Sequence, residues 1–201
     1  MKSKSAAKSA RPYEQKARAI AAEASTRKIL ESFLKRAENQ WFEDITLDSI
    51  AQDAGVTVQT VLRKFGGKAG VLEAAHQHLG ENVQLRRVVD PGNIDRAIDA
   101  LTRDYEEAGR LVLRLLSQED RHPMLHPIIE RGRQGHRKWL SEVFAAHLQS
   151  LPAAQRSGTL DALVVATDIH VWKVVRLEMG RSVPAFKSLV KRLIHGVLNE
   201  A

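Results

Sequence analysis

The stretch IAQDAGVTVQTVLRKF, at residues 50–65, contains two short helical patterns separated by a single glycine. Neither pattern can form a stable helix alone, because isolated helices shorter than about 12–15 residues are marginal in water. The first pattern places Ile50 and Ala54 on one face, and Gly55 follows where a tight turn requires left-handed dihedral angles. Thr57 can then cap the second helix with its hydroxyl group. The stretch therefore predicts a helix-turn-helix.

The second half of this stretch is amphipathic when it is placed on a helical wheel. One arc of about 100° is apolar and contains Val58, Val61, Leu62 and Phe65. The other arc carries hydrogen-bonding side chains, namely Gln59, Thr60, Arg63 and Lys64. The second helix of a helix-turn-helix enters the DNA major groove, where Gln pairs with adenine, Arg pairs with guanine, and Thr and Lys hold phosphates. The alternative is a surface helix hairpin whose charged face is only solvated.

Basic residues are concentrated at the start of the chain. The formal net charge is +7 over 201 residues. Most of this excess lies in the first 18 residues, where Glu14 is the one acidic side chain among six basic ones: Lys2, Lys4, Lys8, Arg11, Lys16 and Arg18. A basic arm in front of a nearly balanced body indicates a polyanionic partner such as DNA. A solubilising or disordered tail has the same composition, so both interpretations stay open here.

The composition excludes several classes of protein. A hydrophobic content of 43% is enough for a packed core. There is no cysteine, and hence no disulfide, no thiol nucleophile and no zinc site built on sulfur. The longest apolar runs are much shorter than a membrane span of about 20 residues, and the first ten residues lack the apolar segment of a secretory signal. We expect a cytoplasmic protein with no membrane association.

Helical periodicity extends along the whole chain, and the alternating pattern of β-strands is absent. We predict an all-α fold, with helices over residues 14–24 and 25–39, 47–54, 58–65, 68–86, 94–118, 127–148, 152–179 and 183–198. The segment Asp90-Pro91-Gly92-Asn93 breaks the helical pattern after residue 86 and separates an N-terminal from a C-terminal domain.

The stretch from about Arg27 to Leu72 resembles the DNA-binding region of the TetR family of bacterial transcriptional regulators. The matching positions are Phe42, Thr46-Leu47, Ile50-Ala51, Ala54-Gly55-Val56, Thr57, Thr60-Val61, Phe65 and Lys68. Two positions differ from the family pattern, since Trp41 replaces a glycine and Leu62 replaces a tyrosine that contacts a phosphate. Because leucine cannot donate that hydrogen bond, Lys64 and Lys68 would supply more of the contact with the DNA backbone.

The resemblance implies a division of the chain into three parts. Residues 1–24 form a basic arm, flexible or partly helical. Residues 25–86 form a three-helix, helix-turn-helix DNA-binding domain with its connecting helix, and residues 87–201 form a helical effector-binding and dimerisation domain. The predicted DNA-contacting residues are Thr46, Thr57, Val58, Gln59, Thr60, Leu62, Arg63, Lys64 and Lys68.

The C-terminal half resembles the same family more weakly, in LVLRLLSQED (111–120), ERGRQGHRKWLSEVF (130–144) and ATDIHVWKVVRLEMG (166–180). The resemblance implies that the last two long helices form a four-helix bundle in a homodimer. Broad apolar stripes near residues 160–178 and 183–198 provide surface for both a core and a partner. Ordinary core packing is the alternative explanation of these stripes.

An unknown small-molecule effector would bind among the helices of residues 94–179. Candidate contacts combine apolar bulk with polar groups, as small-molecule sites do: Tyr105, His136, Trp139, Phe144 and His170. Each of these residues, taken alone, also fits an ordinary position in a core.

We expect a ligand-responsive regulator that binds a palindromic operator in double-stranded DNA as a homodimer. The resemblance implies repression most often, and activation stays open as the alternative. We expect no enzymatic activity, no cofactor and no metal ion. Gly66-Gly67-Lys68 lacks the spacing of a phosphate-binding loop, and Pro123 and Pro127 disrupt the helical presentation of the neighbouring histidines. The alternative is a helical interaction module or small-molecule carrier whose helix-turn-helix no longer binds DNA, which Leu62 favours.

Overall fold

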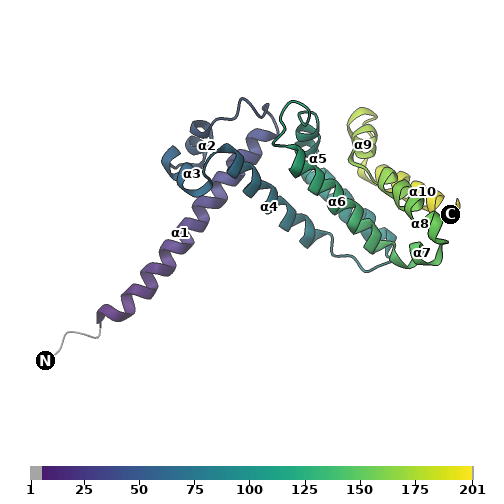
Figure 1. The fold of residues 1–201 in the computed structure, drawn as a ribbon, viewed down its shortest axis with the longest axis horizontal. Coiled ribbons are helices and arrows are strands. Elements are labelled where there is room, and N and C mark those ends of the chain that lie inside the picture. The colour runs from purple at the N-terminus through teal and green to yellow at the C-terminus, as the bar shows by residue number, and fades with distance from the viewer. Residues whose placement is uncertain (1–5, 201) are drawn as a thin grey trace. The chain divides into compact units, whose positions relative to one another are not determined.

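The chain is organised as two compact units, residues 1–77 and 78–201. The structure is a computed structural model that describes residues 6–200, with side chains described for residues 15, 16, 18–83 and 85–199. Every regular element in this range is a helix (Figure 1), which confirms the predicted all-α fold. The chain passes from one unit to the other within α4 (Lys68–Arg86), and the predicted functional boundary lies at the end of this helix.

The first unit packs α2 (Leu47–Ala54) against α1 (Ala6–Ala37), and α3 (Val58–Phe65) against α2. Its fully buried side chains include Ile29, Phe33, Ile45, Ile50 and Val61. Burial of each such side chain contributes about 1.5–3 kcal/mol, so tertiary packing stabilises the two short helices. The segment predicted over residues 14–24 runs into the helix predicted over residues 25–39, a continuation that the sequence allows because no proline or glycine separates them.

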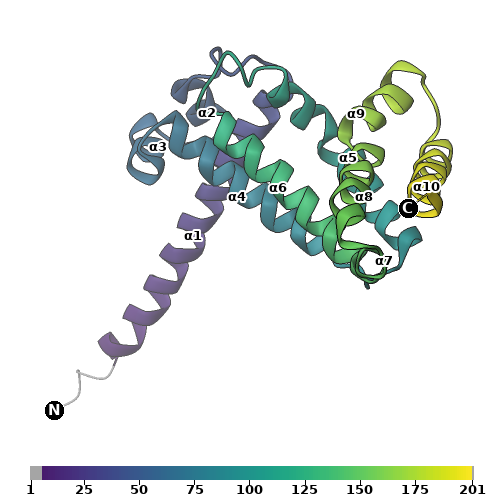
Figure 2. The ribbon, with the colours of Figure 1, turned by 45° about the vertical axis from the view of Figure 1, so that its right-hand side comes forward.

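The second unit is a bundle of helices that Figure 2 shows in a second view. Its elements are α5 (Ile94–Leu116), α6 (His126–Val143), α7 (Ala145–Ser150), α8 (Ala153–Ala166), α9 (Ile169–Trp172), the π-helix η1 (Lys173–Glu178) and α10 (Val183–Glu200). Helix α10 packs on α5 and α8, and α8 also packs on α6. The buried core between them includes Leu101, Leu140, Leu163, Trp172, Phe186, Val190 and Ile194.

Two long helices that the sequence predicts are interrupted, so the predicted extents 127–148 and 152–179 are wrong. The first ends at Val143, and a separate short helix follows it. In the second, the Asp168 carboxylate accepts a hydrogen bond from the backbone N–H of His170 at 2.8 Å and caps a new helix. Aspartate favours such caps because its side chain competes for backbone donors.

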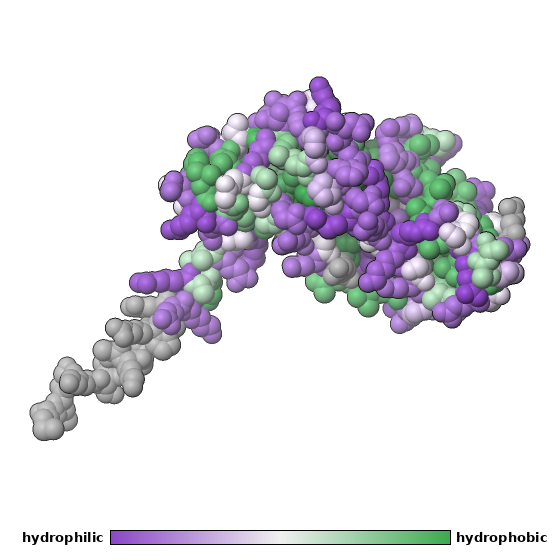
Figure 3. Space-filling view, viewed as in Figure 1, coloured by the Kyte–Doolittle hydropathy of each residue, from purple (hydrophilic) through white to green (hydrophobic). Residues whose placement is uncertain are grey.

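Hydrophobic side chains reach the surface among the C-terminal helices of the second unit (Figure 3). The exposed large apolar residues of this region are Val165, Val174, Met179 and Leu193. None of the helices in the described range is both long and apolar enough to cross a membrane.

Candidate functional site

The turn between α2 and α3 is fixed by local hydrogen bonds that the sequence specifies. Thr46 Oγ1 accepts a bond from the Ser49 amide at 3.1 Å, and Ser49 Oγ accepts one from the Thr46 amide at 3.2 Å. This reciprocal cap satisfies donors that the first turn of a helix leaves unpaired. Gly55 follows α2 with a φ of 66°, a conformation that other residues rarely adopt.

Helix α3 presents one buried face and one exposed face. Val61 is fully buried, whereas Gln59 and Arg63 are exposed. The Thr57 hydroxyl caps this helix, because its Oγ1 accepts a hydrogen bond from the Thr60 amide at 3.2 Å. Leu62, which the wheel assigns to the apolar arc, is 37% exposed and lies on the outer face. The helix therefore offers an amide, a guanidinium and an isobutyl group on one side.

Two predicted DNA-contacting lysines have partners within the first unit. Lys64 Nζ donates to the Ala22 carbonyl at 2.9 Å and to Thr26 Oγ1 at 2.8 Å. Lys68 Nζ donates to the Phe42 carbonyl and lies 4.2 Å from the centroid of the Phe42 ring. Partial burial of this ammonium group lowers the pKa of Lys68. Both lysines therefore contribute to the packing of the unit that carries α3.

One ion pair that holds α2 on α1 was not predicted from the sequence. Arg36 binds the Asp53 carboxylate through two hydrogen bonds, at 2.7 Å and 2.9 Å. These bonds lower the pKa of Asp53. Ser32 Oγ, which is buried, donates to the Ile50 carbonyl at 3.2 Å. Because the paired residues are 17 positions apart, local periodicity carries no signal for this contact.

In the second unit, three of the five predicted effector contacts lie together. The Tyr105 hydroxyl donates to the Thr167 carbonyl at 2.8 Å. His136 Nε2 is 3.0 Å from Thr167 Oγ1, and the His136 ring stacks on Trp139 with centroids 6.1 Å apart. We call these three residues, together with Asp104 and Arg87, the polar hub.

The other two predicted effector contacts lie elsewhere. Phe144 is buried in the apolar core of the unit. His170 is exposed, and its Nδ1 is 2.7 Å from the Asp168 carboxylate.

The centre of the polar hub is a buried ion pair. The Asp104 carboxylate, whose side chain is 3% exposed, accepts hydrogen bonds from Arg86 Nε at 2.7 Å and from Arg87 Nε at 2.5 Å. Arg87 Nη1 is 3.1 Å from His136 Nδ1. Since a guanidinium group only donates, His136 Nδ1 is the acceptor in this contact, and Nε2 carries the ring proton.

Burial determines the protonation states in the hub. Burial first, and the Arg87 charge second, lower the pKa of His136 to about 4, so its ring is neutral at pH 7. Burial also raises the pKa of Tyr105, so its hydroxyl remains a hydrogen-bond donor. Sequence reasoning missed Asp104 and Arg87. A signal was available for Asp104, because it is a carboxylate next to Tyr105 within the apolar stripe of α5.

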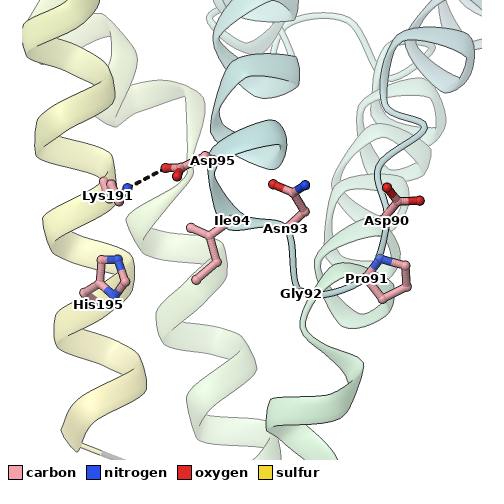
Figure 4. Close-up of a pocket in the computed structure, with 8 residues that line it drawn as sticks. All are labelled: Asp90, Pro91, Gly92, Asn93, Ile94, Asp95, Lys191 and His195. Atoms are coloured by element: carbon pink, nitrogen blue, oxygen red, sulfur yellow. Dashed lines mark hydrogen bonds and ion pairs between the residues drawn. The ribbon is translucent and has the colours of Figure 1, made fainter.

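A surface hollow of the second unit lies at the start of α5, against α10 (Figure 4). Its lining is Asp90, Pro91, Gly92, Asn93, Ile94, Asp95, Lys191 and His195. Lys191 Nζ is 2.6 Å from the Asp95 carboxylate, so opposite charges compensate each other there. This hollow contains none of the predicted effector contacts.

The chain is similar in sequence to a known transcriptional regulator. No family model matches the chain. The HTH-type transcriptional regulator BetI 1 of Chromohalobacter salexigens is 27% identical over 141 residues, which cover 65% of this chain and 70% of that protein.

Solved structures with a similar fold are also those of transcriptional regulators. A transcriptional regulator from Rhodococcus sp. Rha1 has a TM-score of 0.69 at 17% identity, over 88% of this chain and 97% of that chain. A TetR-family transcriptional regulator from Streptomyces coelicolor has a TM-score of 0.66 at 16% identity, over 89% of this chain and 88% of that chain. In its fold over most of its length, the chain therefore resembles transcriptional regulators that include a member of the TetR family.

Proposed function

We propose that the chain is a TetR-family transcriptional regulator that binds operator DNA through α2 and α3. The observation that carries this proposal is the exposed face of α3, where Gln59 and Arg63 extend from a helix capped at both ends and fixed by the buried Val61. A side-chain amide and a guanidinium are the groups that read adenine and guanine in the major groove. We therefore assign base recognition to these two residues.

The remaining predicted contacts would position the helix on the DNA backbone. Thr46 and Thr57 lie exposed at the starts of α2 and α3, where helix N-termini favour phosphate groups. Val58 and Leu62 would offer apolar contact to a thymine methyl group. Lys64, Lys68 and Thr60 would contact phosphates, which would then replace the groups that these side chains bind within the unit.

A homodimer would present two copies of α3 to one DNA site. The exposed apolar side chains Val165, Val174 and Leu193 support a self-complementary surface near residues 160–178 and 183–198. Two-fold symmetry then requires a palindromic operator, with half-sites separated by about one helical turn, or ~34–36 Å.

Regulation would come from a small-molecule effector that binds among the helices of residues 94–179. The polar hub is the favoured place, because Tyr105, His136 and Trp139 gather there. An effector lowers DNA affinity only by as much as it prefers the state that does not bind DNA. In this proposal the chain acts in the cytoplasm as a repressor, without catalysis, and residues 1–24, 25–86 and 87–201 are its functional parts.

A second function has a specific observation in its favour. The exposed Leu62, and the lysines that bind within their own unit, fit a helical interaction or carrier module that no longer binds DNA. Fluorescence anisotropy with labelled duplexes from the region upstream of the chain's own gene separates the two functions. Saturable binding that survives excess unrelated duplex supports the regulator. Absence of saturable binding, or equal competition by specific and unrelated duplex, supports the module.

A further inference from the structure

The guanidinium group of Arg87 is surrounded by groups that attract a cation. Its Nε donates to the buried Asp104 carboxylate, and its Nη1 faces the lone pair of His136 Nδ1 at 3.1 Å. The guanidinium carbon lies 4.8 Å from the centroid of the Trp139 ring. A carboxylate, a neutral imidazole acceptor and an indole face together form a recognition set for a planar organic cation.

The acceptors of this set lie within two long helices, whereas the cation lies just beyond the end of a helix. Asp104 lies on α5, and His136 and Trp139 lie on α6, so two long helices carry all three acceptors. Arg87 instead follows the end of α4, and its neighbours Leu85 and Val88 are 76% and 81% exposed. Its backbone is held in place, because its N–H donates to the Val83 carbonyl at 2.9 Å and its carbonyl accepts a hydrogen bond from Trp139 Nε1 at 3.0 Å. A competing cation can therefore replace Arg87, but a competing anion cannot replace Asp104 without disrupting α5.

The net charge of the groups around Arg87 also favours a cationic ligand over an anionic one. Without Arg87, the directly paired groups would be Arg86, Asp104 and Glu107, since Arg86 also binds Glu107 at 2.9 Å. These three groups sum to one negative charge. An incoming monocation is attracted to this set, and an anion is repelled.

We propose that the polar hub is a binding site for a small guanidinium-type or amidinium-type cation, and that Arg87 occupies this site in the present structure. Binding of such a cation would displace the Arg87 side chain from the hub. The effector role of the site depends on the proposed function, whereas the binding itself does not. The hollow of Figure 4 carries no such proposal, because its lining has no indole face on which a planar cation could stack.

The test uses n-propylguanidinium as the probe and the uncharged n-propylurea, which has nearly the same shape, as its control. Arg87→Ala removes the internal competitor and opens the space of its side chain. Arg87→Met also removes the charge but keeps that space filled. Calorimetric titration of the full chain should give at least about tenfold tighter binding of n-propylguanidinium to Arg87→Ala than to the wild type. Arg87→Met should gain less than Arg87→Ala, because the probe must still displace a side chain there, and n-propylurea should bind none of the three proteins.

Three results would overturn the site. The first is equal affinity of n-propylguanidinium for Arg87→Ala and Arg87→Met. The second is equal binding of n-propylurea and n-propylguanidinium. The third is weaker binding of n-propylguanidinium after Asp95→Asn, which would assign the cation to the hollow of Figure 4. Thermal melts of each variant show whether it is folded. Adding Trp139→Leu to the Arg87→Ala variant removes the indole face and should weaken the binding of n-propylguanidinium.

The effector role has its own readout. Saturating n-propylguanidinium should weaken the binding of operator DNA by the wild type and leave Arg87→Met unaffected. Unchanged DNA affinity in the wild type, with the cation bound, would remove the effector role. Absence of DNA binding without any cation would instead contradict the proposed function and leave the calorimetric result on the site intact.

Discussion

Two exposed side chains of α3, Gln59 and Arg63, differ from Lys64 and Lys68 in what they contact. The lysines donate to carbonyl groups of their own unit, so their removal affects stability as well as any DNA contact. The exposed Gln59 side chain has no hydrogen bond to another described side chain, so its removal reports on DNA contact rather than on packing.

Gln59→Ala should therefore lose about 1–3 kcal/mol of operator affinity and relax the preference at one base pair. Anisotropy titrations with a set of single-base operator variants measure both effects. Gln155→Ala, the same exchange at an exposed position of α8, is the matched control and should bind as the wild type does. Retention of full affinity and full base preference by Gln59→Ala would remove this residue from the recognition surface.

His136 makes the stability of the second unit depend on pH. Its pKa is about 4 in the folded chain and about 6.5 when unfolded. Below pH 6.5 the unfolded state therefore binds more protons, and stability falls as the pH falls toward 4. The free energy of unfolding should decrease by about 2 kcal/mol more between pH 7 and pH 4.5 than it does in His136→Gln. Urea unfolding at the two pH values measures this difference, and identical pH dependence in both proteins would contradict the buried neutral imidazole.

At the scale of elements, α5 and the segment after α8 are joined by contacts that local patterns do not contain. Trp172 of α9 packs on α5 where Gly109 leaves room for its ring. Its indole Nε1 donates to Glu106 at 2.7 Å, and Arg176 of η1 binds the same carboxylate through two hydrogen bonds. These contacts fix the position of a segment whose own helical bonding is irregular.

Gly109→Ala should destabilise the chain, because its methyl group would lie 2.7 Å from Cζ3 of the buried Trp172. Overpacking of this kind costs about 1–3 kcal/mol. Gly158→Ala in α8 is the matched control, since no atom lies within 4 Å of its new methyl group. The control should be more stable than the wild type by about 0.5–1 kcal/mol, because alanine is the better helix former. Chemical unfolding that gives both changes the same sign would contradict the close packing at residue 109.

The charge pattern of the basic arm, residues 1–24, predicts that the arm contributes to DNA affinity. Deletion of residues 1–12 removes Lys2, Lys4, Lys8 and Arg11. If these side chains contact phosphates, the slope of log affinity against log salt should become shallower by about 0.9 for each lost contact. Lys138→Gln, in the second unit, should leave the slope unchanged. An identical slope after the deletion would make the arm a solubility tail.

The sequence predicts the elements that depend on local signals. Thr46, Gly55 and Thr57 are cap and turn residues, and the bounds of α2 and α3 agree with the prediction to the residue. The break at residues 167–168 was missed because apolar periodicity continues across it, while the capping carboxylate of Asp168 ends the helix. The polar hub was predicted only in part, since its ion pair joins α5 to a residue beyond the end of α4, and only tertiary packing brings the two together.

The whole molecule requires a partner surface for its proposed function. One helix of two turns buries too little area to bind a DNA site alone, so two copies must act together. Val165 is 68% exposed on α8, which makes it a surface position whose replacement leaves the core intact.

Val165→Glu should therefore abolish the dimer and operator binding together, because the symmetric interface would bring two carboxylates face to face. Met124→Glu, at another exposed apolar residue of the second unit, should change neither property. Sedimentation velocity gives the oligomeric state, and anisotropy gives the DNA affinity. A monomeric Val165→Glu that binds the intact operator as tightly as the wild type would contradict this assembly.

The π-helix η1 bears on which insertions and deletions the chain can accept during evolution. In η1 the Met179 amide donates to the Val174 carbonyl, five residues earlier, at 2.8 Å. A π-turn accommodates one residue more than an α-turn, so a single-residue insertion within a helix can be absorbed there without moving the flanking helices. We therefore expect alignments with relatives that have a regular helix at this place to require a one-residue gap within Lys173–Glu178, and deletion of one residue from η1 to be tolerated better than a deletion from α5.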